Sequence, residues 1–152
     1  MTRMRFQTTI QRNKETIYAL LTDLRGYQSW LPSSDLYSGV QEISDHPVKV
    51  GTTYVDGGTA SMMQGRVTEL EPNRRISFMQ TMRRKISGLP GGLDIQIRYT
   101  LETGGEFSTR VTREVRLRTH GIFLLFQPVL PGTIRKENER IMQRMKWYLE
   151  AR

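Results

Sequence analysis

Residues 107–120 read FSTRVTREVRLRTH, and apolar and polar side chains alternate along this stretch with the two-residue period of a β-strand. One face carries Phe107, Thr109, Val111, Val115 and Leu117. The opposite face carries Arg110, Arg116 and Arg118. Arg113 departs from the pattern, because it falls on the face that is otherwise apolar. The stretch therefore predicts a long strand that turns one guanidinium toward the protein interior.

The preceding segment, LDIQIRYTLE (residues 93–102), alternates in the same way, and TGGE joins the two segments into a hairpin. Side chains that lie opposite one another in such a pair must point to the same face, so a slip of one residue is excluded. A two-residue turn at Gly104–Gly105 fails this test, whereas a three-residue loop over 103–105 passes it. The pairs that this loop predicts are Tyr99 with Thr109 and Ile95 with Arg113.

The chain before this hairpin predicts one strand, two helices and four further strands. MRFQTTIQ (residues 4–11) alternates as a strand, and Asn13 can cap a helix that Gly26 would end. The apolar stripe of this helix is Ile17, Leu20, Leu21 and Leu24. GYQSWLPSS (residues 26–34) permits a short second helix. The further strands are expected at residues 38–44, 52–57, 62–70 and 75–84.

After Gly121 the period becomes helical, and we expect a final helix of about 20 residues. One side of it is lined by Ile134, Ile141, Met145, Tyr148 and Leu149. The order β-αα-ββββββ-α predicts an α+β fold in a single domain over residues 1–152. We expect a curved antiparallel sheet of about seven strands wrapped around the long C-terminal helix. A helix laid across the concave side of such a sheet can leave a hollow beneath it.

Composition excludes several classes of function. The 152 residues include no cysteine, so disulfides, thiol nucleophiles and thiolate metal sites are excluded. The formal charge is +8, but Lys and Arg are spread along the chain and no zinc-finger, basic-zipper or RNP motif is present. We therefore expect no nucleic-acid partner. No metal-binding or nucleophile-elbow motif appears either, so we expect no metal and no cofactor.

The termini and the longest apolar run bear on the cellular location. MTRMRFQTTIQRN (residues 1–13) lacks the apolar core of a signal peptide, and IFLLF (residues 122–126) is much too short to span a bilayer. We expect a soluble cytoplasmic protein, monomeric or homodimeric, with no integral membrane segment. Peripheral contact with a membrane stays open.

Four segments carry a resemblance that extends over nearly the whole chain. They are IQRNKETIYALLTDLRGYQSWLP (10–32), VKVGTTY (48–54), MQGRVTELEPNRRISF (63–78) and ERIMQRMKWYLEA (139–151). These segments resemble the START-like (SRPBCC) superfamily and, within it, the polyketide cyclase/dehydrase and lipid-transport family. The resemblance implies a helix-grip fold and a hydrophobic cavity for a lipid, a polyketide, an isoprenoid or a similar molecule. The matching segments contain turn and packing residues and no catalytic motif, and a shared fold does not establish a shared chemistry.

The residues predicted to line the cavity face inward on the strands and on the last helix. They are Phe78, Met82, Ile97, Tyr99, Val111, Arg113, Val115, Ile141 and Met145. The alternative is that the apolar members simply form a packed core. Tyr27, Trp30 and Tyr54 are expected at the pocket mouth, because each combines an apolar ring with a polar tip. Eight methionines favour a lining that adapts to its ligand.

Arg113 is the most specific candidate, because an unpaired buried guanidinium is too costly to retain. Three arrangements satisfy it: a β-bulge that turns it outward, a structural pair with an acid such as Glu137, or a polar ligand group. Arg113 and Tyr99 are also the candidate catalytic residues, because they could polarise a carbonyl. Neither His46 nor His120 has an acid at strand or helix spacing.

Three functions follow. The first is a protein that shelters or carries a small, largely apolar ligand. The second is a cyclase or dehydrase that acts on a ligand in the same cavity without a metal, and the sequence leaves open whether any reaction is catalysed. The third is a module that contacts an anionic membrane or a protein through its cationic surface and the run GIFLLFQPVL (residues 121–130).

Overall fold

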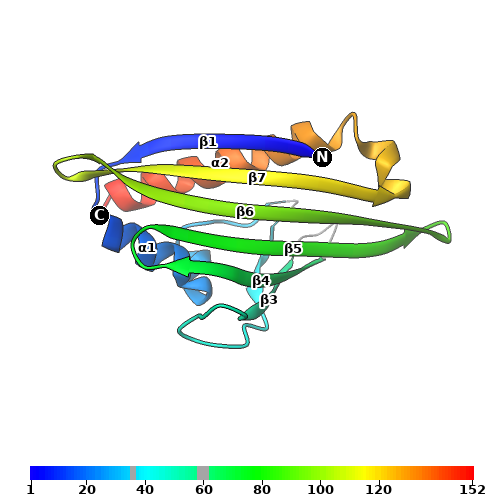
Figure 1. Cartoon of the computed structure of the whole chain (residues 1–152), viewed down its shortest axis with the longest axis horizontal. Helices are drawn as coiled ribbons and strands as arrows, with labels where there is room; N and C mark the ends of the chain where they lie inside the picture. The colour runs from blue at the N-terminus through cyan, green and yellow to red at the C-terminus, as the bar shows by residue number, and fades with distance from the viewer. Residues whose placement is uncertain (35–36, 58–61) are drawn as a thin grey trace.

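The computed structural model of the chain describes residues 1–34, 37–57 and 62–152. Within these ranges, seven antiparallel strands form one curved sheet with the spatial order β1-β7-β6-β5-β4-β3-β2 (Figure 1). The strands are β1 (Thr2–Ile10), β2 (Gly39–Gln41), β3 (Thr53–Gly57), β4 (Met62–Glu71), β5 (Arg75–Ile86), β6 (Leu89–Gly105) and β7 (Ser108–Gly121). The predicted α+β fold and the predicted order of its strands and helices are confirmed.

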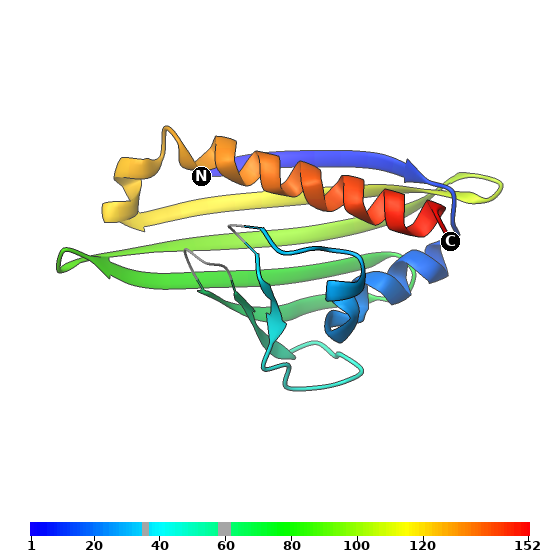
Figure 2. The same ribbon diagram turned by 180° about the vertical axis from the view of Figure 1, so that it is seen from behind.

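The helices cover one face of this sheet (Figure 2). α1 (Lys14–Thr22) continues into the 3-10 helix η1 (Leu24–Ser29), and α1 packs against β5 and β6. After β7, the 3-10 helix η2 (Ile122–Phe126) leads into α2 (Leu130–Glu150), which lies along β1. No helix in the described ranges has the length and apolar character that crossing a bilayer requires.

α1 begins where the sequence predicts but ends earlier. Asn13 caps it, since the Asn13 Oδ1 accepts a hydrogen bond from the backbone N–H of Thr16 at 2.9 Å. The predicted end at Gly26 is wrong. Asp23 leaves the helical conformation with a ψ of 79°, and Gly26 lies inside η1, where its N–H donates to the Asp23 carbonyl at 3.0 Å. The chain tightens into a 3-10 turn there and needs no left-handed glycine.

The β6–β7 hairpin is longer than predicted, and the predicted register is wrong. Tyr99 lies opposite Arg113, which is four residues further along β7 than the predicted partner, and Ile95 lies opposite Leu117. The turn is at Glu106 and Phe107, so Phe107 is exposed and does not face the interior as expected. The two glycines before the turn belong to β6, with a bulge between Thr103 and Gly105.

This shift preserves the interior position of Arg113. The predicted and the observed partner of each β6 residue are four positions apart on β7. Because four is an even number, the side chains of both strands stay on the faces that the sequence predicts. Arg113 is 7% exposed, whereas Arg110, Arg116 and Arg118 on the other face are exposed. The alternating pattern therefore predicts the face of β7 correctly, although it misplaces the turn.

Apolar side chains fill the space between α2 and the β1–β7 edge of the sheet. The buried residues of this region include Met4, Phe6, Val111, Val115, Met142 and Met145, all members of one hydrophobic cluster. Because α2 covers this edge closely, the open space beneath the helices lies further across the sheet, toward β6, β5 and β3.

Candidate functional site

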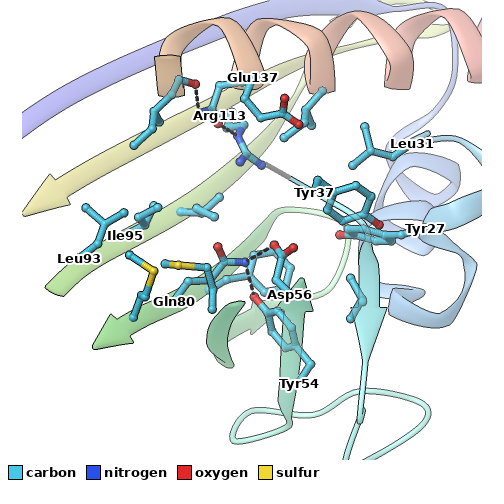
Figure 3. Close-up of a pocket in the computed structure, with 18 of the residues that line it drawn as sticks. Tyr27, Leu31, Tyr37, Tyr54, Asp56, Gln80, Leu93, Ile95, Arg113 and Glu137 are labelled. Atoms are coloured by element: carbon cyan, nitrogen blue, oxygen red, sulfur yellow. Dashed lines mark hydrogen bonds between the residues drawn. The ribbon is translucent and has the colours of Figure 1, made fainter. Parts of the chain in front are cut away.

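A cavity of about 290 Å³ lies between the sheet, η1 and the first half of α2 (Figure 3). Its apolar wall comes from Leu24, Leu31, Val40, Met63, Phe78, Met82, Leu93, Ile95, Ile97, Phe123, Leu130, Ile134 and Ile141. Its polar and aromatic wall comes from Tyr27, Trp30, Tyr37, Tyr54, Asp56, Gln80, Arg84, Tyr99, Arg113, Glu137 and Asn138. The volume is close to the lower end of the range for small-molecule sites.

Six of the nine residues predicted to line the cavity do so: Phe78, Met82, Ile97, Tyr99, Arg113 and Ile141. Val111, Val115 and Met145 do not, and their predicted place on the cavity wall is corrected. All three belong to the buried hydrophobic cluster, and none is more than 1% exposed. The two valines share the inward face of β7 with Arg113, but their short side chains end in the core beneath α2, whereas the longer Arg113 side chain reaches the cavity.

The three aromatic residues predicted at the mouth all line the cavity. Trp30 and Tyr54 are only 1% and 4% exposed, so they belong to the inner wall and not to a rim. Tyr27 stacks edge-on against Trp30 with ring centroids 5.1 Å apart, and its hydroxyl donates to the Leu21 carbonyl at 2.6 Å. Burial raises the pKa of Tyr27 well above its usual value, so its phenol stays neutral.

Arg113 reaches from β7 toward the middle of the cavity and is held by two neutral partners (Figure 3). Its Nε donates to Asn138 Oδ1 at 2.6 Å, and its Nη1 donates to the Tyr99 hydroxyl. The guanidinium also lies over the Tyr99 ring, with its carbon 5.0 Å from the ring centroid. Asn138 is fixed in turn, because its Nδ2 donates to the Ile134 carbonyl at 2.7 Å.

The sequence suggested two structural arrangements for Arg113, a β-bulge that turns it outward and a pair with an acid such as Glu137. Neither is present in the described ranges. No bulge turns it outward, since it remains in register with Tyr99. Glu137 does not pair with it: the Glu137 carboxylate pairs with Arg140 at 2.6 Å and accepts from the Ser34 hydroxyl at 3.0 Å. Arg113 is thus buried without a carboxylate in contact among the described residues.

Across the cavity from Arg113, Gln80 links two polar groups of β3 (Figure 3). Its Nε2 donates to the Tyr54 hydroxyl and to Asp56 Oδ2, each at 3.0 Å. Burial raises the pKa of Asp56 from its usual 3.8 to about 7, and the nearby charge of Glu137 adds to this, while Gln80 and Arg113 act in the other direction. Asp56 therefore exchanges a proton near neutral pH.

Three polar atoms of the wall have no hydrogen-bond partner among the described residues: Trp30 Nε1, Tyr37 Oη and Asp56 Oδ1. Burial raises the pKa of Tyr37 to about 12, so its hydroxyl keeps its proton. Buried polar groups are normally paired, so these three atoms are exceptions that no described residue satisfies. In the described ranges, His, Asp and Glu side chains form no cluster that could hold a metal ion.

Sequence analysis overlooked Asp56, Gln80, Asn138 and Tyr37. For Gln80 and Asn138 the necessary pattern is in the sequence: each is a polar residue on an otherwise apolar face, as Arg113 is. Gln80 falls between Phe78 and Met82 on β5, and Asn138 follows Ile134 by one helical turn. Tyr37 lies between α1 and β2 in a segment without periodicity, and no pattern marks it.

The histidines contribute nothing to the cavity wall. His120 does have an acid beside it, contrary to the sequence-based expectation, because its Nε2 lies 2.6 Å from Asp94 Oδ2. Asp94 also pairs with Arg83 at 2.9 Å. Both His120 and Asp94 are on the outer face of the sheet, where alternation along β6 and β7 places them.

The chain matches the family model "Polyketide cyclase / dehydrase and lipid transport" over residues 1–150. No curated protein is significantly similar to it in sequence. A START superfamily protein from Mycobacterium smegmatis has a TM-score of 0.72 at 13% identity, with 98% of this chain and 97% of that chain covered. The Zhui aromatase/cyclase from a Streptomyces species has a TM-score of 0.76 at 14% identity, with 98% and 93% covered. The Aha1 dimer from Colwellia psychrerythraea has a TM-score of 0.61 at 19% identity, with 99% and 97% covered.

At these identities the solved structures establish a common fold and leave the chemistry to be argued from the site. The family model carries the assignment further, because it spans nearly all of the sequence. It shows that this chain belongs to the polyketide cyclase/dehydrase and lipid-transport family.

Proposed function

We propose that the protein binds one small, largely apolar molecule in the cavity and holds the polar end of that molecule at Arg113. Membership of the family supports ligand binding or cyclase chemistry in general. The observation that carries the specific proposal is a charged guanidinium, 7% exposed, on the wall of a mainly apolar cavity, whose hydrogen-bond partners among the described residues are the neutral Asn138 and Tyr99.

The bonding capacity of Arg113 supports this role. A guanidinium has five N–H groups. The two bonds to Asn138 and Tyr99 use two of them, so three remain for another acceptor. A carboxylate, an enolate or a carbonyl oxygen would satisfy them, and its interaction with a charged donor is stronger than a neutral hydrogen bond. The apolar wall would then cover the rest of the ligand.

The test uses two dyes that share one apolar body. 1-Anilinonaphthalene-8-sulfonate carries an anionic group, and N-phenyl-1-naphthylamine does not. Removing one hydrogen bond to a charged group costs about 1.5–3 kcal/mol, so Arg113→Met should weaken sulfonate binding about 10- to 100-fold. The uncharged dye should bind Arg113→Met nearly as well as wild type. Fluorescence titration gives both dissociation constants.

Two further variants serve as controls. Arg110→Met removes an exposed charge from the other face of the same strand and should change neither dye. Asn138→Asp places a carboxylate beside Arg113, so it should weaken the anionic dye and spare the uncharged one. If the two dyes respond alike to Arg113→Met, the polar role of Arg113 is wrong; if wild type binds neither, ligand binding itself is contradicted.

A second candidate is catalysis of an aldol-type ring closure, favoured by Asp56. This carboxyl titrates near pH 7, has an oxygen without a hydrogen-bond partner among the described residues and lies across the same cavity from Arg113. The Asp56 carboxylate would remove a proton from a carbon between two carbonyls. The carbanion would attack a second carbonyl of the same molecule, Arg113 would stabilise the alkoxide that forms, and Asp56 would return the proton to it.

The test is turnover of a synthetic poly-β-ketone thioester, followed by liquid chromatography and mass spectrometry. As a catalyst, wild type should form a cyclic product at a rate that rises with pH through about 7, the pKa of Asp56. Asp56→Asn should lose the reaction but still bind the uncharged dye. Dye binding without any product from wild type would leave the protein a binder and eliminate this candidate.

A further inference from the structure

We propose that the end of the molecule formed by η2 and the β5–β6 hairpin docks on an anionic lipid bilayer. This inference does not depend on the ligand or on catalysis. It concerns five exposed apolar residues, here named the apolar tip: Leu89, Leu124, Leu125, Phe126 and Val129. Leu125 and Val129 are 73% and 69% exposed, and the other three are between 45% and 57% exposed.

These residues come from two segments that lie side by side. Gly91 of β6 pairs with Gly121 at the end of β7, and a Cβ at Gly91 would be only 2.5 Å from the Phe123 ring. Leu89, the first residue of β6, therefore lies near η2 at the same end of the sheet (Figures 1 and 2). The five residues of the apolar tip thus gather at one end of the molecule.

The charge around the apolar tip has one sign. Residues 82–93 and 118–136, which form this end, contain no Asp or Glu. They contain six basic residues: Arg83, Arg84, Lys85, Arg118, Arg135 and Lys136. The acids that directly follow these two segments are both paired, Asp94 with Arg83 and His120, and Glu137 with Arg140. Exposed apolar side chains ringed by cations are complementary to an anionic membrane surface, where the apolar groups enter the interface and the cations contact the headgroups.

The same charge argues against the other occupant to be considered, a second copy of the chain. Two copies joined through the apolar tip would bring two predominantly basic rims together, and like charges at an interface are unfavourable. The tip also leads to the cavity: the Phe126 ring packs edge-on against Phe123, with centroids 5.9 Å apart, and Phe123 lines the cavity wall. A docked protein would thus present this wall near the membrane.

Vesicle co-sedimentation tests the proposal with purified full-length chain. Wild type should sediment with phosphatidylcholine vesicles that contain phosphatidylglycerol, much less with pure phosphatidylcholine, and less as salt increases. Leu125→Ser combined with Phe126→Ser removes two apolar groups from the contact and should weaken binding at least about tenfold. Lys85→Glu combined with Lys136→Glu should weaken it as well, and circular dichroism verifies that each variant is folded.

Matched controls come from the opposite end of the sheet. Phe107 is 76% exposed at the β6–β7 turn, so Phe107→Ser removes an aromatic ring that is more exposed than Phe126, and Arg110→Glu reverses an exposed charge there. Both should bind anionic vesicles as wild type does. The proposal is overturned if wild type ignores anionic vesicles, or if the tip variants bind like the controls. It is also overturned if ultracentrifugation shows a dimer that the tip variants dissociate while wild type leaves vesicles unbound.

Discussion

The surroundings of Asp56 shift its pKa clearly. Burial on the cavity wall disfavours its ionised form, and Gln80 and Arg113 offset this only in part. In the unfolded chain the carboxyl regains its usual pKa of 3.8, against about 7 in the folded protein. Between these values the folded state binds more protons than the unfolded state, so the free energy of unfolding that this group controls falls as pH rises from about 4 to 7.

Asp56→Asn should remove this pH-dependent fall in the free energy of unfolding, because asparagine has no charge to bury. Its side-chain oxygen can still accept a hydrogen bond from Gln80. We expect the variant and wild type to have similar free energies of unfolding at pH 4. At pH 8 the variant should be more stable by up to about 4 kcal/mol, since one pKa unit corresponds to about 1.36 kcal/mol. Urea unfolding at both pH values measures the difference. A gap that stays constant with pH would contradict the assigned pKa.

Residue patterns explain why part of the site can be predicted from sequence. Arg113 was found because a charge on an apolar strand face is conspicuous, and its interior position survives a wrong register. Its partners could not be found in that way, because Tyr99 and Asn138 meet it only through the β6–β7 pairing and the placement of α2. The cost of burying a guanidinium pointed to an acid such as Glu137, but that acid is already paired with Arg140.

Among the elements, β3 and β4 form the wall that carries Asp56 and Tyr54. Tyr54 lies opposite Gly65, and its ring covers the glycine so closely that a Cβ there would be 2.2 Å from the Tyr54 Cζ. The same ring packs edge-on against Phe78, with centroids 6.1 Å apart. The glycine is therefore required for this aromatic ring to lie flat on the sheet and hold Gln80.

Gly65→Ala should displace the Tyr54 ring and lower the free energy of unfolding by about 1–3 kcal/mol, as overpacking of a core does. Gly132→Ala is the control: nothing lies within 4 Å of a Cβ there, and an alanine near the start of α2 should be neutral or stabilise by up to about 1 kcal/mol. Thermal or urea unfolding compares the two. Equal stability of the two variants would show that Tyr54 is not packed against Gly65.

The periodic pattern of apolar residues predicts the order of the strands and helices but not where each one ends. Strand and helix order follow from alternation and from apolar stripes, and the fold they imply is confirmed. The ends of elements depend on local geometry that periodicity does not contain. Gly104 and Gly105 read as a turn but extend β6 through a bulge, and Gly26 reads as a helix end but lies in a 3-10 turn.

At the scale of the whole molecule, α2 covers the sheet unevenly. It fills the space over β1 and β7 with side chains such as Met145 and Val115, and it leaves about 290 Å³ toward β5 and β6. The distinction between core and cavity wall thus depends on where one helix crosses seven strands. The position of α2 across the sheet cannot be read from the sequence. For this reason three residues predicted to line the cavity, Val111, Val115 and Met145, belong to the core.

Filling the cavity should show whether the naphthalene dyes bind inside it or on the exposed apolar tip. Met82 lines the cavity, and Met82→Trp adds an aromatic ring there. We expect both naphthalene dyes to lose most of their affinity. The free energy of unfolding should fall by at most about 1–3 kcal/mol, the usual cost of overpacking. Fluorescence titration measures the loss. Unchanged affinity for the uncharged dye would place its binding outside the cavity.

A crystal structure of the wild-type protein with 6-bromo-2-naphthol, with the bromine located by its anomalous scattering, would test the cavity directly. We expect a bromine peak between α2 and β5–β6 and a naphthol oxygen within hydrogen-bond distance of the Arg113 guanidinium. Side chains closing this space, with bromine only on the outer surface, would contradict this expectation.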